Sequence, residues 1–229
     1  MEKKTQSPEN QRVLGLQTEI GLERLGLMAS QLWYDDPRGL LFSLSRYKFV
    51  AKMLAGKKNV LELGCGDGFH SRIVQQTVEK LTVTDHDPLF IEDLKARNPD
   101  KWRPEAFVHN MLKGPTDGQY DAIYLMDVLE HIEKASERTF LTNTLKSLDD
   151  DGTLIVGMPS LESQVYASEI SKMGHINCKS GEELRACISE YFKDVLIFSM
   201  NDEVVHTGYF PMSHYLIAVA MGKRTGDSK

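Results

Sequence analysis

Three glycines alternate with other residues directly after a short apolar run, in the stretch Gly64-Cys65-Gly66-Asp67-Gly68. Glycines let the backbone approach a ligand closely, and the N–H groups at the start of a following helix point toward it. Asp85 stands 21 residues after Gly64, at the end of the next apolar run. A carboxylate there can accept hydrogen bonds from both hydroxyls of a ribose. The pattern predicts a site for a nucleotide-like cofactor.

The charge of this turn favours a cationic ligand. Glu62 precedes the glycines and Asp67 lies among them, and the spacing is G-x-G-x-G rather than G-x-G-x-x-G. Two carboxylates would repel the pyrophosphate of a dinucleotide, whereas they attract the ammonium and sulfonium groups of S-adenosylmethionine. No Gly-Lys-Ser/Thr follows, which excludes a P-loop. S-adenosylmethionine is therefore the expected cofactor.

A second set of residues that could do chemistry follows the apolar run 122–126. Asp127, Glu130 and His131 stand at positions i, i+3 and i+4, so a helical turn would place them on one face. His175, just before a predicted helix, is a further candidate. Carboxylates and imidazoles together can hold a divalent cation, or an imidazole can orient and deprotonate a hydroxyl. A purely structural role for the Glu-His pair is the third possibility.

The elements that must position these groups alternate along the chain. Apolar strand-like runs and helical stretches follow one another, which is typical of a parallel sheet with helices on both faces. The last two strands are joined by only 14 residues, so they are predicted to be antiparallel. The predicted strands are 59–63, 81–84, 106–109, 122–126, 153–158, 195–200 and 215–221. The predicted helices are 20–33, 37–54, 70–78, 88–96, 136–148 and 181–192, with Asp36 as the N-cap of the second.

Composition limits the class of protein. The chain has 229 residues, of which 41% are hydrophobic and 26% charged, as in a soluble domain with one main core. No apolar run approaches the roughly 20 residues that span a bilayer, so no membrane partner is expected. The polar N-terminus lacks the features of a signal peptide, and we expect a cytoplasmic location. Three cysteines without a Cys-x-x-Cys pair indicate neither a disulfide framework nor a zinc site.

The glycine turn and the acid that follows it resemble those of the class I S-adenosylmethionine-dependent methyltransferases, over about residues 58–221. The resemblance implies an α/β fold: a Rossmann-like seven-stranded, mostly parallel sheet with a C-terminal antiparallel hairpin, helices on both faces and a helical N-terminal cap. The expected organisation is a flexible tail (1–12), the cap (13–57), the methyltransferase domain (58–221) and a second tail (222–229). The cofactor contacts implied are Glu62, Gly64, Cys65, Gly66, Asp67, Gly68, Asp85, His86, Asn110, Met111 and Met126. Asn110 departs from the acid usual at its position, but its amide oxygen can accept the same hydrogen bond.

The segment after residue 126 resembles the metal site of small-RNA 3′-end 2′-O-methyltransferases. That resemblance implies Asp127, Glu130, His131 and His175 as ligands of a divalent cation such as Mg²⁺ or Mn²⁺. Such an ion lowers the pKa of a hydroxyl and orients a vicinal diol. Asp127 departs from the usual Glu by one methylene. Without a metal, His131 or His175 is the expected catalytic base or orienting group.

The expected function is methyl transfer to a hydroxyl of a small polar acceptor, a sugar or a nucleotide-linked sugar. Loops that mix aromatic and polar side chains, around Trp33 and Tyr209, suit such a ring. An N-methyltransferase or a phenol or quinone O-methyltransferase would share every cofactor residue. The net charge of −6 makes a nucleic acid an unlikely partner, so RNA methylation ranks lower. A catalytically silent cofactor-binding module is the remaining alternative, and the oligomeric state is left open.

Overall fold

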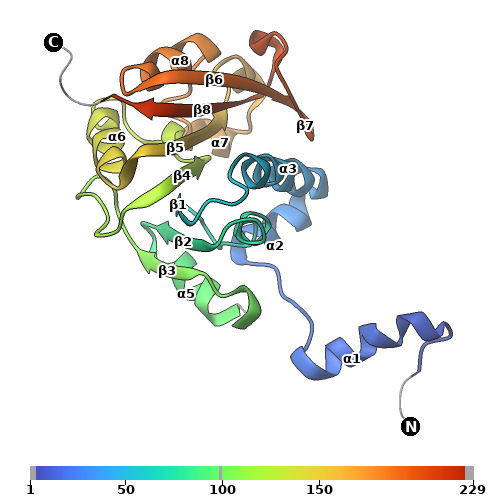
Figure 1. The fold of residues 1–229 in the computed structure, drawn as a ribbon. Coiled ribbons are helices and arrows are strands. Elements are labelled where there is room, and N and C mark those ends of the chain that lie inside the picture. Colours follow the sequence, from blue (N-terminus) through green and yellow to red (C-terminus); the bar gives the residue numbers. More distant parts are fainter. Residues whose placement is uncertain (1–3, 98–99, 225–229) are drawn as a thin grey trace.

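The computed structural model describes residues 4–97 and 100–224. One mixed sheet runs through the described chain, with the strand order β3-β2-β1-β4-β5-β8-β6-β7 (Figure 1). Neighbouring strands from β3 to β5 are parallel, and β8 lies antiparallel between β5 and β6. The predicted α/β class and the antiparallel closing pair are confirmed. The strands are β1 (Asn59–Leu63), β2 (Lys80–Asp85), β3 (Glu105–Val108), β4 (Tyr120–Met126), β5 (Leu148–Pro159), β6 (Phe192–Asn201), β7 (Val204–His206) and β8 (Tyr215–Lys223).

The sheet has eight strands in the described residues, one more than predicted. The additional strand is β7, which pairs with the end of β6 through a tight turn at Asp202, a residue with a φ of +50°. Three residues are too short to show a strand periodicity in the sequence. The prediction therefore treated this hairpin as part of a linker.

Two apolar cores lie on opposite faces of the sheet. Along β4, Tyr124 and Met126 contribute to one core, while Ile123 and Leu125 contribute to the other, because successive strand side chains point to opposite faces. α3 (Pro37–Met53), α4 (Ser71–Gln75) and α5 (Pro88–Arg97) supply the first core, and α6 (Glu137–Lys146) and α8 (Gly181–Ser189) the second. The sheet is thus covered on both sides, as expected for parallel strands.

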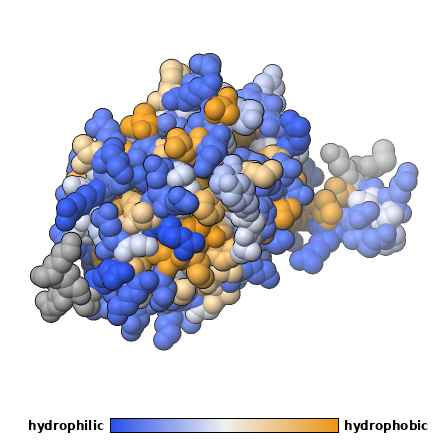
Figure 2. Space-filling view, turned by 90° about the horizontal axis from the view of Figure 1, so that it is seen from above, coloured by the Kyte–Doolittle hydropathy of each residue, from blue (hydrophilic) through white to orange (hydrophobic). Residues whose placement is uncertain are grey.

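The N-terminal region differs from the prediction of one helix over 20–33. α1 (Gln11–Ile20) ends at Gly21, whose φ of +80° breaks the helix, and α2 (Leu27–Asp35) begins after Gly26. α1 also starts inside the stretch 1–12 predicted as a tail, of which 1–3 lie outside the described residues. In Figures 1 and 2 α1 stands away from the body, with apolar side chains exposed. The predicted cap of α3 is confirmed, since Asp36 accepts a hydrogen bond from Arg38 N.

At the other end, β8 runs to Lys223, which pairs with Phe192 of β6. The strand predicted at 215–221 therefore continues for two more residues, and 225–229 lie outside the described residues. None of the helices in 4–97 and 100–224 is both long and apolar enough to cross a membrane. The remaining short helices are η1 (Pro8–Asn10), η2 (Asp100–Trp102), η3 (Leu129–His131), η4 (Glu162–Tyr166), α7 (Glu169–Gly174) and η5 (Phe210–Met212).

Candidate active site

The glycine turn lies at the carboxyl end of β1, where the strand order reverses between β1 and β4. Ligands bind at such a switch point in open α/β sheets. Gly64, Gly66 and Gly68 all have positive φ, at 71°, 53° and 65°. A Cβ on Gly64 would overlap Val128, which follows β4, so the turns after β1 and β4 are packed against each other. The predicted cofactor turn therefore borders the segment that contains Glu130 and His131.

Asp85 lies at the end of β2, beside this turn. Its carboxylate accepts hydrogen bonds from Gly66 N and Asp87 N, both at 2.9 Å. Each carboxylate oxygen has a second acceptor position, so Asp85 can hold the turn and still receive hydroxyl groups. His86 beside it is exposed, as a residue flanking a planar ring would be. Asp87 caps α5 by accepting from Leu89 N at 2.9 Å, which is a structural role.

Glu62 and Asp67 do not stand open to a ligand, contrary to the charge argument made from the sequence. Glu62 is fully buried, and Tyr47 and Tyr124 each donate a hydrogen bond of 2.7 Å to it. Burial raises the pKa of Glu62 despite these bonds. Asp67 accepts from Ala29 N at 2.8 Å, which fixes the start of α2. In this geometry the two carboxylates anchor the cap to the turn.

The other predicted cofactor contacts divide into open and buried residues. Cys65, Met111 and Met126 are buried to 5% exposure or less and belong to the cores or the turn. Burial, and then the nearby Glu62, raise the pKa of the Cys65 thiol, so it is not a reactive nucleophile. Asn110 is partly exposed, but its side-chain oxygen accepts from Leu112 N at 2.9 Å. That bond leaves the oxygen one further acceptor position.

Asp127 is not placed with Glu130 and His131 on one helical face. It has a left-handed φ of 58°, and only Leu129–His131 form the short helix η3. The Asp127 carboxylate instead accepts two hydrogen bonds from Arg46 Nη1, at 2.8 and 3.0 Å. The Arg46 guanidinium stacks 3.8 Å from the centre of the Tyr215 ring. Asp127 is therefore used by an ion pair, and its predicted place among the metal ligands is wrong in this structure.

Glu130, His131 and His175 do come together. One ligand atom from each lies within 4.8 Å of the other two. Glu130 is fully buried, and neither of its carboxylate oxygens has a hydrogen-bond partner among the described residues. Burial, and then the neighbouring Asp127, raise the pKa of Glu130 well above its ordinary value. A buried carboxylate with no partner is costly, and a bound cation would satisfy it.

Each histidine of this group is oriented by an oxygen acceptor. His131 Nδ1 lies 2.9 Å from Gly174 O, and His175 Nδ1 lies 2.9 Å from Gln164 Oε1. Gln164 donates its own NH₂ to Ser160 O, which fixes its oxygen toward His175. Both Nδ1 atoms must therefore be the protonated ones in the neutral rings. Both Nε2 atoms keep a lone pair, which suits a metal ligand or a base.

Arg46 and Gln164 were missed by the sequence reasoning. Arg46 belongs to α3, 81 residues before its partner Asp127, so no local spacing connects them. The available signal was its position beside Tyr47 and four residues before Val50, on the buried stripe of the helix. Gln164 belongs to η4, for which no periodicity predicts a helix.

Comparisons with known proteins show that the chain is similar to methyltransferases. Residues 60–152 match a family model described as a methyltransferase domain. Nodulation protein S of Bradyrhizobium diazoefficiens is 30% identical over 139 residues, covering 57% of this chain and 66% of that protein. The mitochondrial ubiquinone biosynthesis O-methyltransferase of Schizosaccharomyces pombe is 27% identical over 143 residues, covering 56% of this chain and 50% of that protein. The chain thus spans between half and two thirds of the length of these curated relatives.

A solved structure gives the same fold. The N-methyltransferase NodS from Bradyrhizobium japonicum WM9, in complex with S-adenosyl-L-homocysteine, superposes with a TM-score of 0.61 at 20% identity, covering 83% of this chain and 90% of that one. Residues 60–152 thus match a methyltransferase domain, and the fold is that of the class I S-adenosylmethionine-dependent methyltransferases. The resemblance inferred from the glycine turn and the acid after β2 is confirmed.

The glycine turn can be compared with the cofactor of these related methyltransferases. A Cβ on Gly66 would overlap Met28 of α2, so the cap packs closely on the turn and only glycine fits at this position. Asp85 keeps acceptor positions at the rim of that turn, as a ribose requires. The turn and Asp85 therefore fit S-adenosylmethionine, which is the cofactor of this family.

Proposed function

We propose that the protein transfers the methyl group of S-adenosylmethionine to a hydroxyl of a small polar acceptor, with a divalent cation held by Glu130, His131 and His175. The observation that carries the proposal is the buried Glu130 carboxylate, which has no partner among the described residues and faces two imidazoles. Glu130 and His131 follow β4, directly beside the glycine turn, and His175 joins them from the end of α7. A methyl donor bound on the turn and an acceptor at the group would be neighbours.

A bound cation would lower the pKa of the acceptor hydroxyl and orient a vicinal diol. The residues of the chain supply the rest. Asp85 and the glycines hold the cofactor, and Gln164 and Gly174 O fix the rings of His175 and His131. Catalysis then comes largely from proximity and orientation.

The acceptor we propose is a sugar or a nucleotide-linked sugar. Two exposed aromatic side chains, Tyr166 in η4 and Tyr209 beside η5, offer faces on which a sugar ring can stack, and η4 contacts the group through Gln164. The polar Gln164 and Ser163 lie on the same short helix as Tyr166. Stacking together with hydrogen bonds is the usual combination for a polar ring.

A second candidate is methylation of a nitrogen or of a phenol or quinone hydroxyl without a metal. It is favoured by the names of the relatives and by the exposed apolar side chains of Val165, Ile170 and Met173 on η4 and α7. In that case His175 Nε2 would accept the proton. Burial, and then the neighbouring His131, lower the pKa of His175, which keeps it neutral and able to act as a base.

Metal titration separates these candidates. We expect chelator-treated protein to bind one Mn²⁺ per chain in calorimetry, and Glu130→Gln to weaken that binding roughly tenfold or more, because a ligand is lost. Glu133→Gln, an exposed carboxylate in the same loop, is the matched control and should bind as the wild type does. Methylation of a sugar diol should need the ion. A wild-type protein that does not bind Mn²⁺ but methylates an amine or a phenol would establish the second candidate instead.

A further inference from the structure

The chain between α7 and α8 carries His175 but belongs to no helix or strand. It runs from His175 to Ser180, and its one strand-like contact is an isolated bridge between Lys179 and Ser160. No ladder or helical turn holds this stretch in register. Its position relative to Glu130 and His131 is set by a few backbone hydrogen bonds and by side chains.

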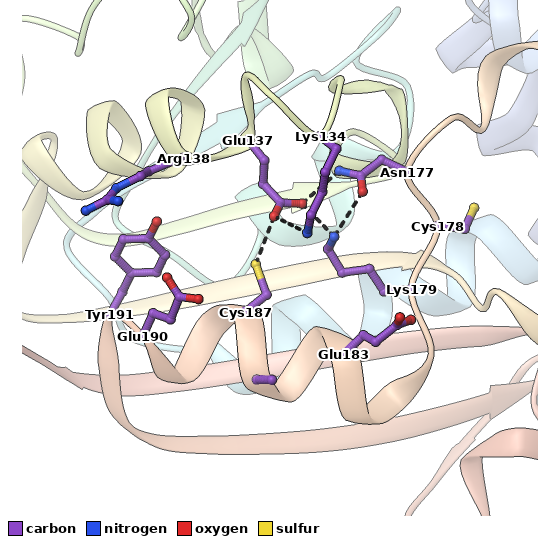
Figure 3. Close-up of a pocket in the computed structure, with 11 residues that line it drawn as sticks. Lys134, Glu137, Arg138, Asn177, Cys178, Lys179, Glu183, Cys187, Glu190 and Tyr191 are labelled. Carbon is purple, nitrogen blue, oxygen red and sulfur yellow. Dashed lines mark hydrogen bonds and ion pairs between the residues drawn. The ribbon is translucent and has the colours of Figure 1, made fainter.

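A buried network behind this stretch supplies the contacts. Glu137, at the start of α6, accepts from Asn177 Nδ2 at 2.7 Å and from Lys179 Nζ at 2.6 Å. Lys179 also donates to Asn177 Oδ1 at 3.0 Å, and Lys134 donates to the other oxygen of Glu137 at 2.9 Å. Figure 3 shows the ammonium groups of both lysines side by side at this carboxylate. We call Glu137, Asn177 and Lys179 the anchor.

The anchor is continuous with the three-residue group. The amides of Ile176 and Asn177 both donate to Glu130 O, at 2.9 and 3.0 Å. Asn177 therefore bonds to Glu137 through its side chain and to Glu130 through its backbone. Asn177 is two residues after His175. It is also hydrogen-bonded directly to Glu130, the residue with the buried carboxylate.

The anchor is held firmly. Glu137, Asn177 and Lys179 are each less than 10% exposed. Burial alone would raise the pKa of Glu137, but the bonds from Lys179, Lys134 and Asn177 outweigh it and lower the pKa to about 2. The carboxylate thus stays ionised and paired at any working pH. A buried ion pair of this kind often contributes more to a unique arrangement than to net stability.

We infer that Glu137, Asn177 and Lys179 are positioning residues, which hold His175 at ligand distance from Glu130 and His131. The inference rests on the proposed role of that group in binding a cation. Lys179 acts through Glu137 and Asn177, and none of the three is itself a ligand. A cavity of about 570 Å³ adjoins the anchor, lined by Arg138, Glu183, Cys187 and Tyr191 among others.

The test uses Lys179→Met and Glu137→Gln in the full chain, with Lys172→Met as the control. Lys172 forms a comparable pair with Glu169, but on the surface of α7. Two quantities are measured: the affinity for Mn²⁺ and the hydrogen exchange of the Ile176 and Asn177 amides. We expect both anchor variants to bind Mn²⁺ about tenfold more weakly and to exchange the Ile176 and Asn177 amides about tenfold faster. The exchange of the β4 amides should stay as in the wild type, and the control variant should match the wild type in both quantities. Should the anchor variants fail to fold, Asn177→Ser removes the side-chain bonds of Asn177 and keeps the ion pair between Glu137 and Lys179.

The outcomes separate the anchor from the metal proposal. Folded anchor variants with wild-type exchange at residues 176 and 177 would overturn the inference, and so would faster exchange with unchanged Mn²⁺ affinity. A wild-type protein that does not bind Mn²⁺, combined with faster exchange in the variants, would reject the metal while supporting the anchor as the device that places His175.

Discussion

Asp85 is the residue on which cofactor affinity should depend most. Replacing it with alanine removes acceptors for a ribose and the bond to Gly66 N that shapes the turn. We expect Asp85→Ala to weaken binding of S-adenosylhomocysteine by about 2 kcal/mol, roughly 30-fold in Kd, measured by calorimetry.

Asp87→Ala is the control for this change. Asp87 follows two residues later, and its carboxylate caps α5 by accepting from Leu89 N, so losing that side chain should cost about 1 kcal/mol of stability and leave affinity unchanged. Equal affinities for Asp85→Ala and the wild type would remove Asp85 from the ribose site.

Single residues also show why part of the site could not be foreseen. The order Asp127, Glu130, His131 fits one face of a helix, and the left-handed φ of Asp127 is what breaks that fit. The cause is a long-range contact, since Arg46 reaches Asp127 from α3. From its charge, Glu62 is predicted to contact the cofactor, yet its carboxylate accepts hydrogen bonds from two tyrosines. In each case a partner distant in sequence decides the role.

At the level of elements, α3 joins the cap to the sheet through polar contacts as well as apolar ones. Tyr47 donates to Glu62 of β1, and Ser43 lies 2.6 Å from the ring of His70, directly before α4. Arg46 lies between them on the same face and pairs with Asp127. One helix therefore contacts the ends of β1 and β4 and fixes the wall beside the glycine turn.

We expect Tyr47→Phe to lower the free energy of unfolding by about 1–3 kcal/mol, because it removes a hydrogen bond from a fully buried carboxylate. Urea denaturation measures this. Tyr34→Phe removes the same hydroxyl from an exposed tyrosine of α2 and should have no effect. If the two variants unfold at the same urea concentration, the bond between Tyr47 and Glu62 does not stabilise the cap.

For the whole molecule, the sequence predicts the parallel core well because its signals are local. β1 occupies the predicted range 59–63, and the nearly continuous burial along β4 matches an apolar run covered on both faces. The broken N-terminal helix and the short β7 were not predicted, since Gly21 and a three-residue hairpin arm leave weak patterns. The closing antiparallel strand was predicted from linker length alone and lies between β5 and β6.

The whole molecule also explains how distant residues make one site. Parallel strands end at one edge of the sheet, so the turns after β1, β2 and β4 meet there although they are spread over residues 64–131. His175 is added from the stretch after β5 and α7, and the anchor sets its place. Fold and site are thus consequences of the same strand order.

The account is tested most directly by titrating S-adenosylhomocysteine into the chelator-treated wild-type protein in a calorimeter. We predict saturable binding of one molecule per chain without added metal, because the glycine turn and Asp85 belong to the cofactor site and not to the three-residue group. A protein that is folded by circular dichroism and gives no binding heat at several temperatures would contradict the central claim that this turn holds the methyl donor.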